Sequence, residues 1–256
     1  MSQDPSWRTA ISRVRPDDIR VRGYDLVEMV GRRSFGDVVF LLLSGELPGG
    51  NEGRMVDACL VAASEHSVVA PSVAAARFVA SSGVPLQAAV AAGVTSLGEH
   101  HGGAVDACAR ALLDADETGK PDTEAAAEIA QSHKESGRRL PGFGHVVHTA
   151  DPRAPRLFEV AGELGFRGRW CALAEAFESV TEQIFGKGLR MNVDGALAAI
   201  LLELGLDWRL GKAFYVIARP PGFVAHVHEE QTRERPYRDV GWENVGYDGP
   251  EDRELP

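Results

Sequence analysis

The sequence predicts an all-α protein, and three observations support this class. Apolar residues recur at steps of three and four along most of the chain, which is the period of a helix. Runs in which apolar and polar residues alternate are scarce, and we identify no convincing strand. Glycine, proline and capping residues divide the chain into segments of helical length. We therefore expect about ten helices and no internal repeat.

The expected helices follow one another with short breaks. Asn51 is a natural N-cap for the first, Pro71 and Pro85 begin the next two, and Gly98 ends the third. The third is almost wholly apolar, so we expect it to be buried on every side. The Pro-Pro-Gly string at 220–222 predicts a kink or break, and the tail from 235 onward reads as irregular. The ranges are 51–66, 71–81, 86–97, 103–113, 122–135, 156–164, 170–185, 194–204, 210–219 and 223–232.

Length and composition indicate an ordinary globular protein. The chain has 256 residues, of which 44% are hydrophobic and 25% charged, and its formal net charge is −10. Such a chain lacks the broad basic surface that nucleic-acid binding requires. The longest apolar run, residues 38–43, is too short to cross a membrane, and the amino terminus has no apolar signal segment. We expect a soluble, cytoplasmic protein.

Two familiar kinds of site are disfavoured by residue spacing. Cys59, Cys108 and Cys171 are scattered, which argues against a disulfide framework and against a cysteine-based zinc site. The histidines form no pair at the spacing of a helical zinc motif, so we expect no metal. A serine hydrolase would need a Gly-x-Ser-x-Gly turn, and the chain has none.

The first segment that helix packing alone does not explain is residues 98–104. It ends an apolar helix with His100 and His101, followed by Gly102 and Gly103. The glycines allow the backbone to approach a ligand closely at the start of the next helix. The alternative is a glycine-capped helix end that carries surface histidines.

The second segment is a constrained loop that contains several cations. Residues 138–145 read Arg-Arg-Leu-Pro-Gly-Phe-Gly-His, and Asp151-Pro152-Arg153 follows. Arginine binds carboxylates and phosphates through a planar fork, so the loop suits recognition of an anion. The alternative is a solvated connector.

The third segment places an acid at the start of an apolar helix. Asp194 lies in Asn192-Val193-Asp194-Gly195, where it could be a helix cap or a general base in a partly dry cleft. Burial would raise the pKa of such a carboxyl, and the helix amino end would lower it. Arg219 ends another apolar helix and could point its guanidinium either to solvent or into a cavity.

Taken in order, these segments resemble the citrate synthase family. The pattern comprises His101-Gly102-Gly103-Ala104, the loop from Pro141 to His145, Asp151-Pro152-Arg153, Asn192-Val193-Asp194, and Ala218-Arg219 with Gly222 and His226. The resemblance covers roughly residues 34–238 and implies an all-α, citrate synthase-like fold of two lobes. The larger lobe would comprise residues 1–112 and 216–256, and the smaller lobe residues 113–215.

The resemblance also implies roles for the residues that match. His101 would stabilise the enolate of acetyl-CoA, and Asp194 would exchange a proton with its methyl group. His145 would serve the carbonyl or hydroxyl of oxaloacetate. Arg153 and Arg219 would bind the substrate carboxylates.

Further contacts follow from the same resemblance. His66 looks like an additional substrate-binding histidine. Either Arg235 or Arg238 would reach the site of a second subunit in a homodimer. Coenzyme A would enter as a thioester substrate, with no tightly bound cofactor, and would lie along the loop through Arg138, Arg139, Gly142, Phe143 and Gly144.

The chain departs from citrate synthases in ways that favour a related reaction. Gly195 stands where synthases usually place an aromatic residue, and Asn-Val-Asp-Gly is similar to the citryl-CoA lyase module of ATP-citrate lyase. The size fits a free-standing citryl-CoA lyase, although His101 is a synthase-like feature. The alternatives are a citrate or methylcitrate synthase and a non-catalytic binding protein. The intact His101, His145 and Asp194 argue against the last.

Overall fold

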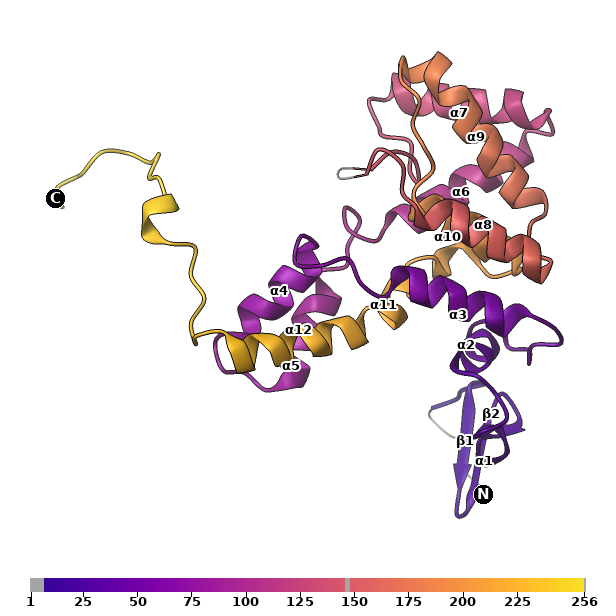
Figure 1. Cartoon of the computed structure of the whole chain (residues 1–256), viewed down its shortest axis with the longest axis horizontal. Helices are drawn as coiled ribbons and strands as arrows, with labels where there is room; N and C mark the ends of the chain where they lie inside the picture. Colours follow the sequence, from indigo (N-terminus) through magenta and orange to yellow (C-terminus); the bar gives the residue numbers. More distant parts are fainter. Residues whose placement is uncertain (1–6, 146–147, 256) are drawn as a thin grey trace. The chain divides into compact units, whose positions relative to one another are not determined.

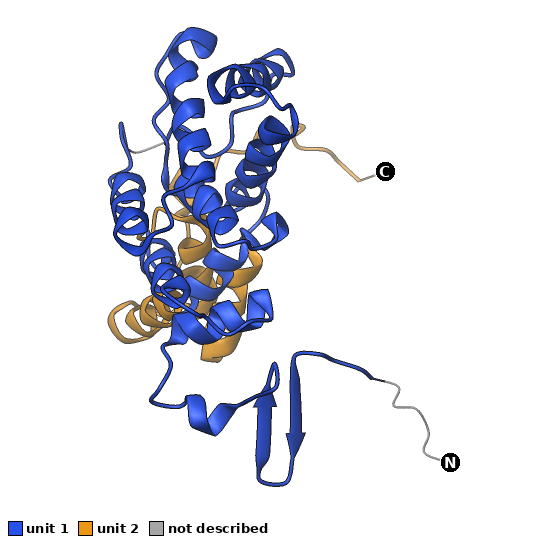
Figure 2. Cartoon of the chain, turned by 90° about the vertical axis from the view of Figure 1, so that its right-hand side faces the viewer, with its two compact units in different colours: residues 1–66, 97–220 blue, residues 67–96, 221–256 orange. Residues whose placement is uncertain are grey.

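The computed structural model describes residues 7–145 and 148–255. The chain splits into two compact units (Figure 2). Unit 1 comprises residues 1–66 and 97–220, and unit 2 comprises residues 67–96 and 221–256. The two lobes that the family resemblance implies are a different partition of the chain and stay a prediction.

The expectation that the chain has no strand is wrong. Unit 1 begins with an antiparallel sheet in the order β1 (Ser12–Arg15), β2 (Asp18–Val21) and β3 (Tyr24–Asp25). Ion pairs join the strands: Arg13 Nη2 of β1 lies 2.8 Å from Asp18 Oδ2 of β2, and Arg20 Nη2 of β2 lies 3.2 Å from Asp25 Oδ2 of β3. Strands this short, which bury no apolar face, give too weak a pattern to recognise. The other regular elements of the described ranges are helical, so the all-α class is confirmed.

Unit 1 is built around one buried helix, α10 (Val193–Glu203), in which nearly every residue is buried. It packs against α3, α6, α8 and α9 (Figure 1). Its amino end, which carries Asp194, therefore lies inside the unit. The surrounding helices are α1 (Leu26–Met29), α2 (Phe35–Ser44), α3 (Glu52–Ala63), α6 (Ala104–Glu117), α7 (Asp122–Glu135), α8 (Arg153–Leu164), α9 (Arg169–Phe185) and α11 (Ala213–Ala218), with a 3-10 turn, η1 (Trp208–Leu210).

Unit 2 has its own small core. It contains α4 (Pro71–Ala80), α5 (Leu86–Thr95), α12 (Pro220–Arg233) and the 3-10 turn η2 (Trp242–Asn244). The prediction that residues 86–97 are buried on every side is wrong, because within α5 only Ala89 and Gly93 are buried and Leu86 is 42% exposed. Two helices, α4 and α12, cover one face of α5, and the other face is open.

The predicted helix boundaries agree with the structure to within a few residues. The helix start at Asn51 is confirmed, although the Asn51 side chain makes no capping bond and its amide donates to Leu164 O at 3.3 Å. The break expected at residues 220–222 falls at Arg219 instead. Helix α12 begins at Pro220, where a missing N–H costs nothing. Among the described residues, no helix combines the length and apolar character needed to span a bilayer.

Candidate active site

Asp194 lies at the start of α10, but it is not the residue that caps the helix. Asn192 is the N-cap, and its Oδ1 accepts from the backbone N–H groups of Asp194 at 2.9 Å and of Gly195 at 3.2 Å. The Asp194 carboxylate therefore does not cap the helix. Its Oδ1 accepts a hydrogen bond from the Tyr215 hydroxyl at 2.5 Å. Burial raises the pKa of Asp194 above its ordinary value, despite the opposing hydrogen bond from Tyr215.

The loop that carries His145 is held against the chain that precedes Asp194. Gly144 N–H donates to Arg190 O at 2.7 Å, and Asn192 N–H donates to Gly142 O at 3.0 Å. A Cβ at Gly142 would lie 2.8 Å from Gly195 Cα, and one at Gly195 would lie 2.6 Å from Gly142 O. Only two glycines fit at this contact.

The predicted coenzyme A loop has a mixed structural setting. The ring of Phe143 is buried and stacks on Phe177 with a centroid distance of 6.0 Å, so it belongs to the core. Arg138 and Arg139 are exposed, and Arg138 Nε donates to Ser136 Oγ at 2.9 Å. Residues 146 and 147 lie outside the described residues. Contact of this loop with coenzyme A stays a prediction.

Three imidazoles lie together in unit 1. The ring centroids of His66 and His145 are 5.5 Å apart, and those of His145 and His148 are 4.6 Å apart. The backbone N–H of His148 donates to His145 Nδ1 at 3.0 Å. In the neutral ring this places the proton of His145 on Nε2, which then acts as a donor. Burial lowers the pKa of His66 and of His145, so both rings are neutral at pH 7.

Charged groups of both signs surround these imidazoles. One ligand atom from each of His66, His145 and His148 lies within 4.8 Å of the others, a grouping that could in principle hold a metal. Arg153 and Arg219 also act on His66, and their positive charge helps burial to lower its pKa. The two guanidinium groups attract carboxylates, while Asp151 and Asp194 act on His145 with the opposite charge.

Arg153 is held in one orientation by a neighbouring acid. Its Nε and Nη2 donate to Asp151 Oδ1 at 3.0 Å and Oδ2 at 2.8 Å. Asp151 Oδ2 also accepts from Val193 N–H at 3.0 Å, which ties Arg153 to the start of α10. Burial would raise the pKa of Asp151, but these hydrogen bonds outweigh it and hold the pKa below its ordinary value.

Arg219 is a buried cation with an unused donor. It is only 4% exposed, its Nε donates to Ala63 O at 2.7 Å, and its Cζ lies 5.3 Å from the centroid of the Tyr215 ring. Its Nη1 is buried and has no hydrogen-bond partner among the described residues. An unsatisfied buried guanidinium nitrogen is costly, and a ligand carboxylate would satisfy it.

His101 lies in a tight turn near Tyr215. Gly98 N–H donates to His101 O at 2.9 Å, and His101 N–H donates to Gly98 O at 3.2 Å. The next residue, Gly102, has a φ of +83°, and a Cβ there would lie 3.4 Å from Tyr215 Cδ2. Burial and the charge of Arg219 lower the pKa of His101, so its ring is neutral at pH 7.

Sequence reasoning missed Tyr215, and it assigned no separate role to Asp151, Asn192 or His148. Tyr215 lies in the apolar run of residues 213–218, where no motif marks it as functional. One signal could have found it, because Tyr215 precedes Arg219 by four residues and so lies on the same helical face. The predicted residues His66, His101, His145, Arg153, Asp194 and Arg219 all belong to unit 1.

Residues 50–239 match the family model for the citrate synthase C-terminal domain. The chain belongs to the citrate synthase family. Its fold superposes on the solved citryl-CoA lyase of Hydrogenobacter thermophilus with a TM-score of 0.91, 41% identity and 98% coverage of both chains.

Two other proteins that the chain resembles are longer than the chain itself. The citrate/2-methylcitrate synthase of Bacillus subtilis is 34% identical over 215 residues, which are 82% of this chain and 55% of the relative. The chain thus spans about half the length of the curated relatives it first matches. ATP citrate lyase of Methanosaeta concilii, solved with (3S)-citryl-CoA, has a TM-score of 0.83 at 21% identity over 98% of this chain and 43% of that one, and shows a shared fold.

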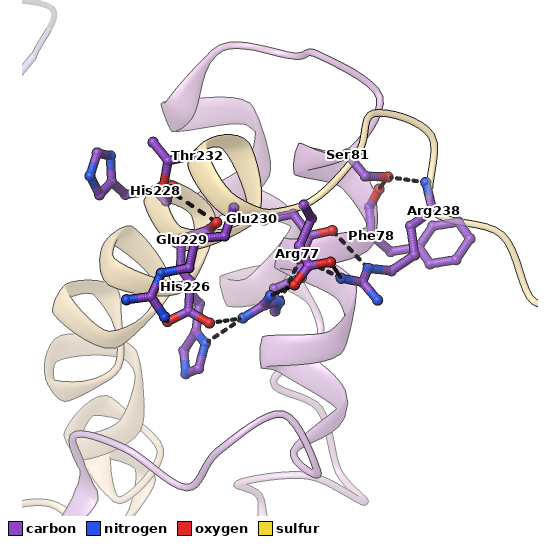
Figure 3. A network of polar contacts seen from close by, with 11 residues as sticks. Arg77, Phe78, Ser81, His226, His228, Glu229, Glu230, Thr232 and Arg238 are labelled. Atoms are coloured by element: carbon purple, nitrogen blue, oxygen red, sulfur yellow. Dashed lines mark hydrogen bonds and ion pairs between the residues drawn. The ribbon is translucent and has the colours of Figure 1, made fainter.

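The two arginines expected to serve a second subunit lie in unit 2 and differ in their surroundings. Arg238 Nε and Nη2 donate to Glu230 Oε1 at 2.7 Å and Oε2 at 2.9 Å (Figure 3). Glu230, whose side chain is 1% exposed, also accepts from Arg77 Nε at 2.7 Å. Arg235 is exposed and has no hydrogen bond or ion pair within the described ranges. Arg238 is therefore occupied inside its own unit, whereas Arg235 is available.

Proposed function

We propose that this citrate synthase family member is a citryl-CoA lyase, which cleaves citryl-CoA to acetyl-CoA and oxaloacetate. The observation that carries the proposal is the open Nη1 of buried Arg219 in the unit that holds a carboxyl of raised pKa, Asp194. The first suits a substrate carboxylate, and the second suits delivery of a proton to carbon. The match to the Hydrogenobacter thermophilus citryl-CoA lyase over 98% of both chains supports the same reaction.

In the proposed reaction the bond between the carbinol carbon and the methylene next to the thioester breaks. The hydroxyl loses its proton as the carbonyl of oxaloacetate forms, and the bonding pair moves into the thioester enolate. His145, with its proton on Nε2, donates a hydrogen bond to the substrate oxygen, and neutral His66 accepts the hydroxyl proton. His101 donates to the enolate oxygen. Asp194, protonated in the substrate complex, then protonates the methylene carbon.

The arginines and the loop provide binding in this scheme. Arg153 and Arg219 hold substrate carboxylates, since both are oriented by protein acceptors before substrate arrives. Coenzyme A enters as part of the substrate, with its phosphates near Arg138 and Arg139 and its pantetheine along Gly142 and Gly144. The scheme uses no tightly bound cofactor and no metal.

We also infer that the active form is a homodimer in which Arg235 completes the partner's site. Within the described ranges Arg235 has no ion pair, whereas Arg238 is bound to Glu230. Unit 2 also exposes apolar side chains that a second copy would cover, including Phe78 on α4, Leu86 on α5 and Val224 on α12.

The test of the activity is a stopped assay of the purified protein with citryl-CoA. A lyase releases acetyl-CoA and oxaloacetate, and the oxaloacetate can be read by its reduction with NADH. Asp194→Asn should reduce turnover by at least about 1,000-fold while leaving the unfolding midpoint nearly unchanged. Full activity of this variant, or acetyl-CoA formation that does not depend on the folded protein, would reject the proposal.

The second candidate is a citrate or methylcitrate synthase-type condensation. The 34% identity to the Bacillus subtilis citrate/2-methylcitrate synthase favours it, as does the histidine at position 101. The same assay separates the two, because a synthase would convert citryl-CoA to citrate and free coenzyme A.

Mixing two inactive variants tests the shared site. Asp194→Asn and Arg235→Ala each remove one half of a composite site, so a heterodimer retains one intact site. Random mixing should restore about a quarter of the wild-type sites. Arg238→Ala is the matched control. Removal of the Arg238 side chain should lower the stability of the protein, but mixing this variant with Asp194→Asn should not restore activity by complementation. A monomer by sedimentation, or no recovery on mixing, would contradict the composite site.

A further inference from the structure

Tyr215 contacts both Asp194 and Arg219, although it matches no part of the family motifs quoted above. We propose that Tyr215 is a positioning residue for Asp194. The Tyr215 hydroxyl occupies Oδ1 of Asp194 and so places the acid proton on Oδ2, the oxygen that delivers the proton to carbon. The inference rests on the proposed function for the identity of the acceptor carbon. The pairing itself rests on geometry alone.

The Tyr215 side chain is fixed on several sides. The residue is 5% exposed, and its hydroxyl donates to Asp194 Oδ1 at 2.5 Å. One face of its ring lies against the guanidinium of Arg219, with Cζ 5.3 Å from the centroid. The ring edge lies near Gly102, in the turn that carries His101. A ring confined in this way cannot rotate its hydroxyl away from Asp194.

The direction of the hydrogen bond decides which oxygen can carry the acid proton. Burial and the adjacent Asp194 raise the pKa of Tyr215 well above 10, so the phenol keeps its proton and always donates. With Oδ1 occupied as an acceptor, a proton on Asp194 must reside on Oδ2. No hydrogen bond to Oδ2 occurs within the described part of the chain. Oδ2 is the atom left to meet a substrate.

Other charged groups also act on Asp194, but none does so through a direct hydrogen bond to its carboxylate in the described ranges. They come from the loop before α8, the start of α8 and the end of α11, and the buried thiol of Cys108 also faces Asp194 from α6. The groups are His145, Asp151, Arg153 and Arg219. Removing the Tyr215 hydroxyl therefore removes the one direct donor to the carboxylate and leaves these charges in place.

The test measures the pKa of Asp194 directly and then reads its effect on turnover. Tyr215→Phe removes the hydroxyl and keeps the ring, and Tyr24→Phe in β3 is the matched control. In ¹³C-aspartate spectra, with Asp194→Asn for assignment, we expect the pKa of Asp194 to rise by about one to two units, since a hydrogen bond to a charged group is lost. The kcat for citryl-CoA cleavage should fall about tenfold, with KM changed less than about twofold, because the proton is no longer confined to Oδ2.

The pH profile distinguishes positioning from a loss of packing. Cleavage needs protonated Asp194, so the alkaline limb of kcat should move up with its pKa in Tyr215→Phe. Site-specific 3-fluorotyrosine at position 215 keeps the fold and strengthens the donor, so the same limb and the same pKa should move down. An Asp194 pKa that is unchanged in both proteins would overturn the proposal. If the pKa of Asp194 shifts in opposite directions in the two altered proteins, but the wild-type protein does not cleave citryl-CoA, the pairing is upheld and the proposed function is rejected.

Discussion

A methyl group added at Gly195 would test the contact that positions the His145 loop. In an isolated helix, replacing glycine by alanine stabilises by about 1 kcal/mol. Here the new Cβ would lie 2.6 Å from Gly142 O and 2.8 Å from Met191 Cγ. Gly142 O cannot move away without stretching its 3.0 Å bond from Asn192 N–H. Overpacking of this kind costs about 1–3 kcal/mol, so the clash outweighs the helix preference.

We therefore expect Gly195→Ala to lower the free energy of unfolding by up to about 2 kcal/mol in urea titrations. It should also lower kcat, because the displaced loop carries His145. Gly162→Ala is the matched control, since a Cβ in that part of α8 meets nothing closer than Arg167 Cδ at 3.8 Å. The control should gain about 0.5–1 kcal/mol. A Gly195→Ala protein that is at least as stable as wild type, with full kcat, would refute this account of the loop.

Two further predictions concern the arginines. Arg219→Lys should raise the KM for citryl-CoA by about tenfold, because lysine has no planar fork that could bind Ala63 O and a carboxylate at the same time. An unchanged KM would show that Arg219 does not bind the substrate. Glu230→Gln should destabilise the protein by about 2–4 kcal/mol at pH 7, since it leaves Arg77 and Arg238 facing an amide. Burial would raise the pKa of Glu230, but the two arginines hold it below its ordinary value of 4.5. The stability that Glu230 contributes is therefore present above about pH 4.5 and is lost as the pH falls through the lower folded pKa. A gap between wild type and variant that widens on acidification would contradict this.

Much of the helical architecture could be predicted because its signals are local. Period, glycines and prolines are readable in the sequence, and α4, α7 and α9 begin within one or two residues of their expected positions. Whether a helix is covered on one face or on all faces depends on how many neighbours surround it. That number is set by the tertiary fold, so the apolar character of α5 gave the wrong expectation. The N-terminal sheet was missed for a related reason, since charged pairs hold it together and no apolar face does.

Part of the candidate site could also be predicted, because some of its residues carry local signals in the sequence. Asp194, His101 and Arg219 stood out because glycines or helix ends surround them in sequence. Tyr215 did not, because its hydroxyl acquires a role only when α11 places it against α10. The choice between Arg235 and Arg238 likewise depended on Glu230, a buried acid whose partners no sequence spacing reveals.

The pairing between the His145 loop and the chain before α10 has a consequence for folding kinetics. The loop has no regular structure of its own and is held by segments far along the chain, as when Asn192 Nδ2 donates to Gly144 O at 2.6 Å across 48 residues. Such contacts close a long loop, and their entropic cost is met only after both segments have come together. Helices α8 and α9, which lie between the two segments, can form earlier because the backbone hydrogen bonds within each helix are local. Catalytic competence should therefore return later than the helical circular dichroism signal when the denatured protein refolds.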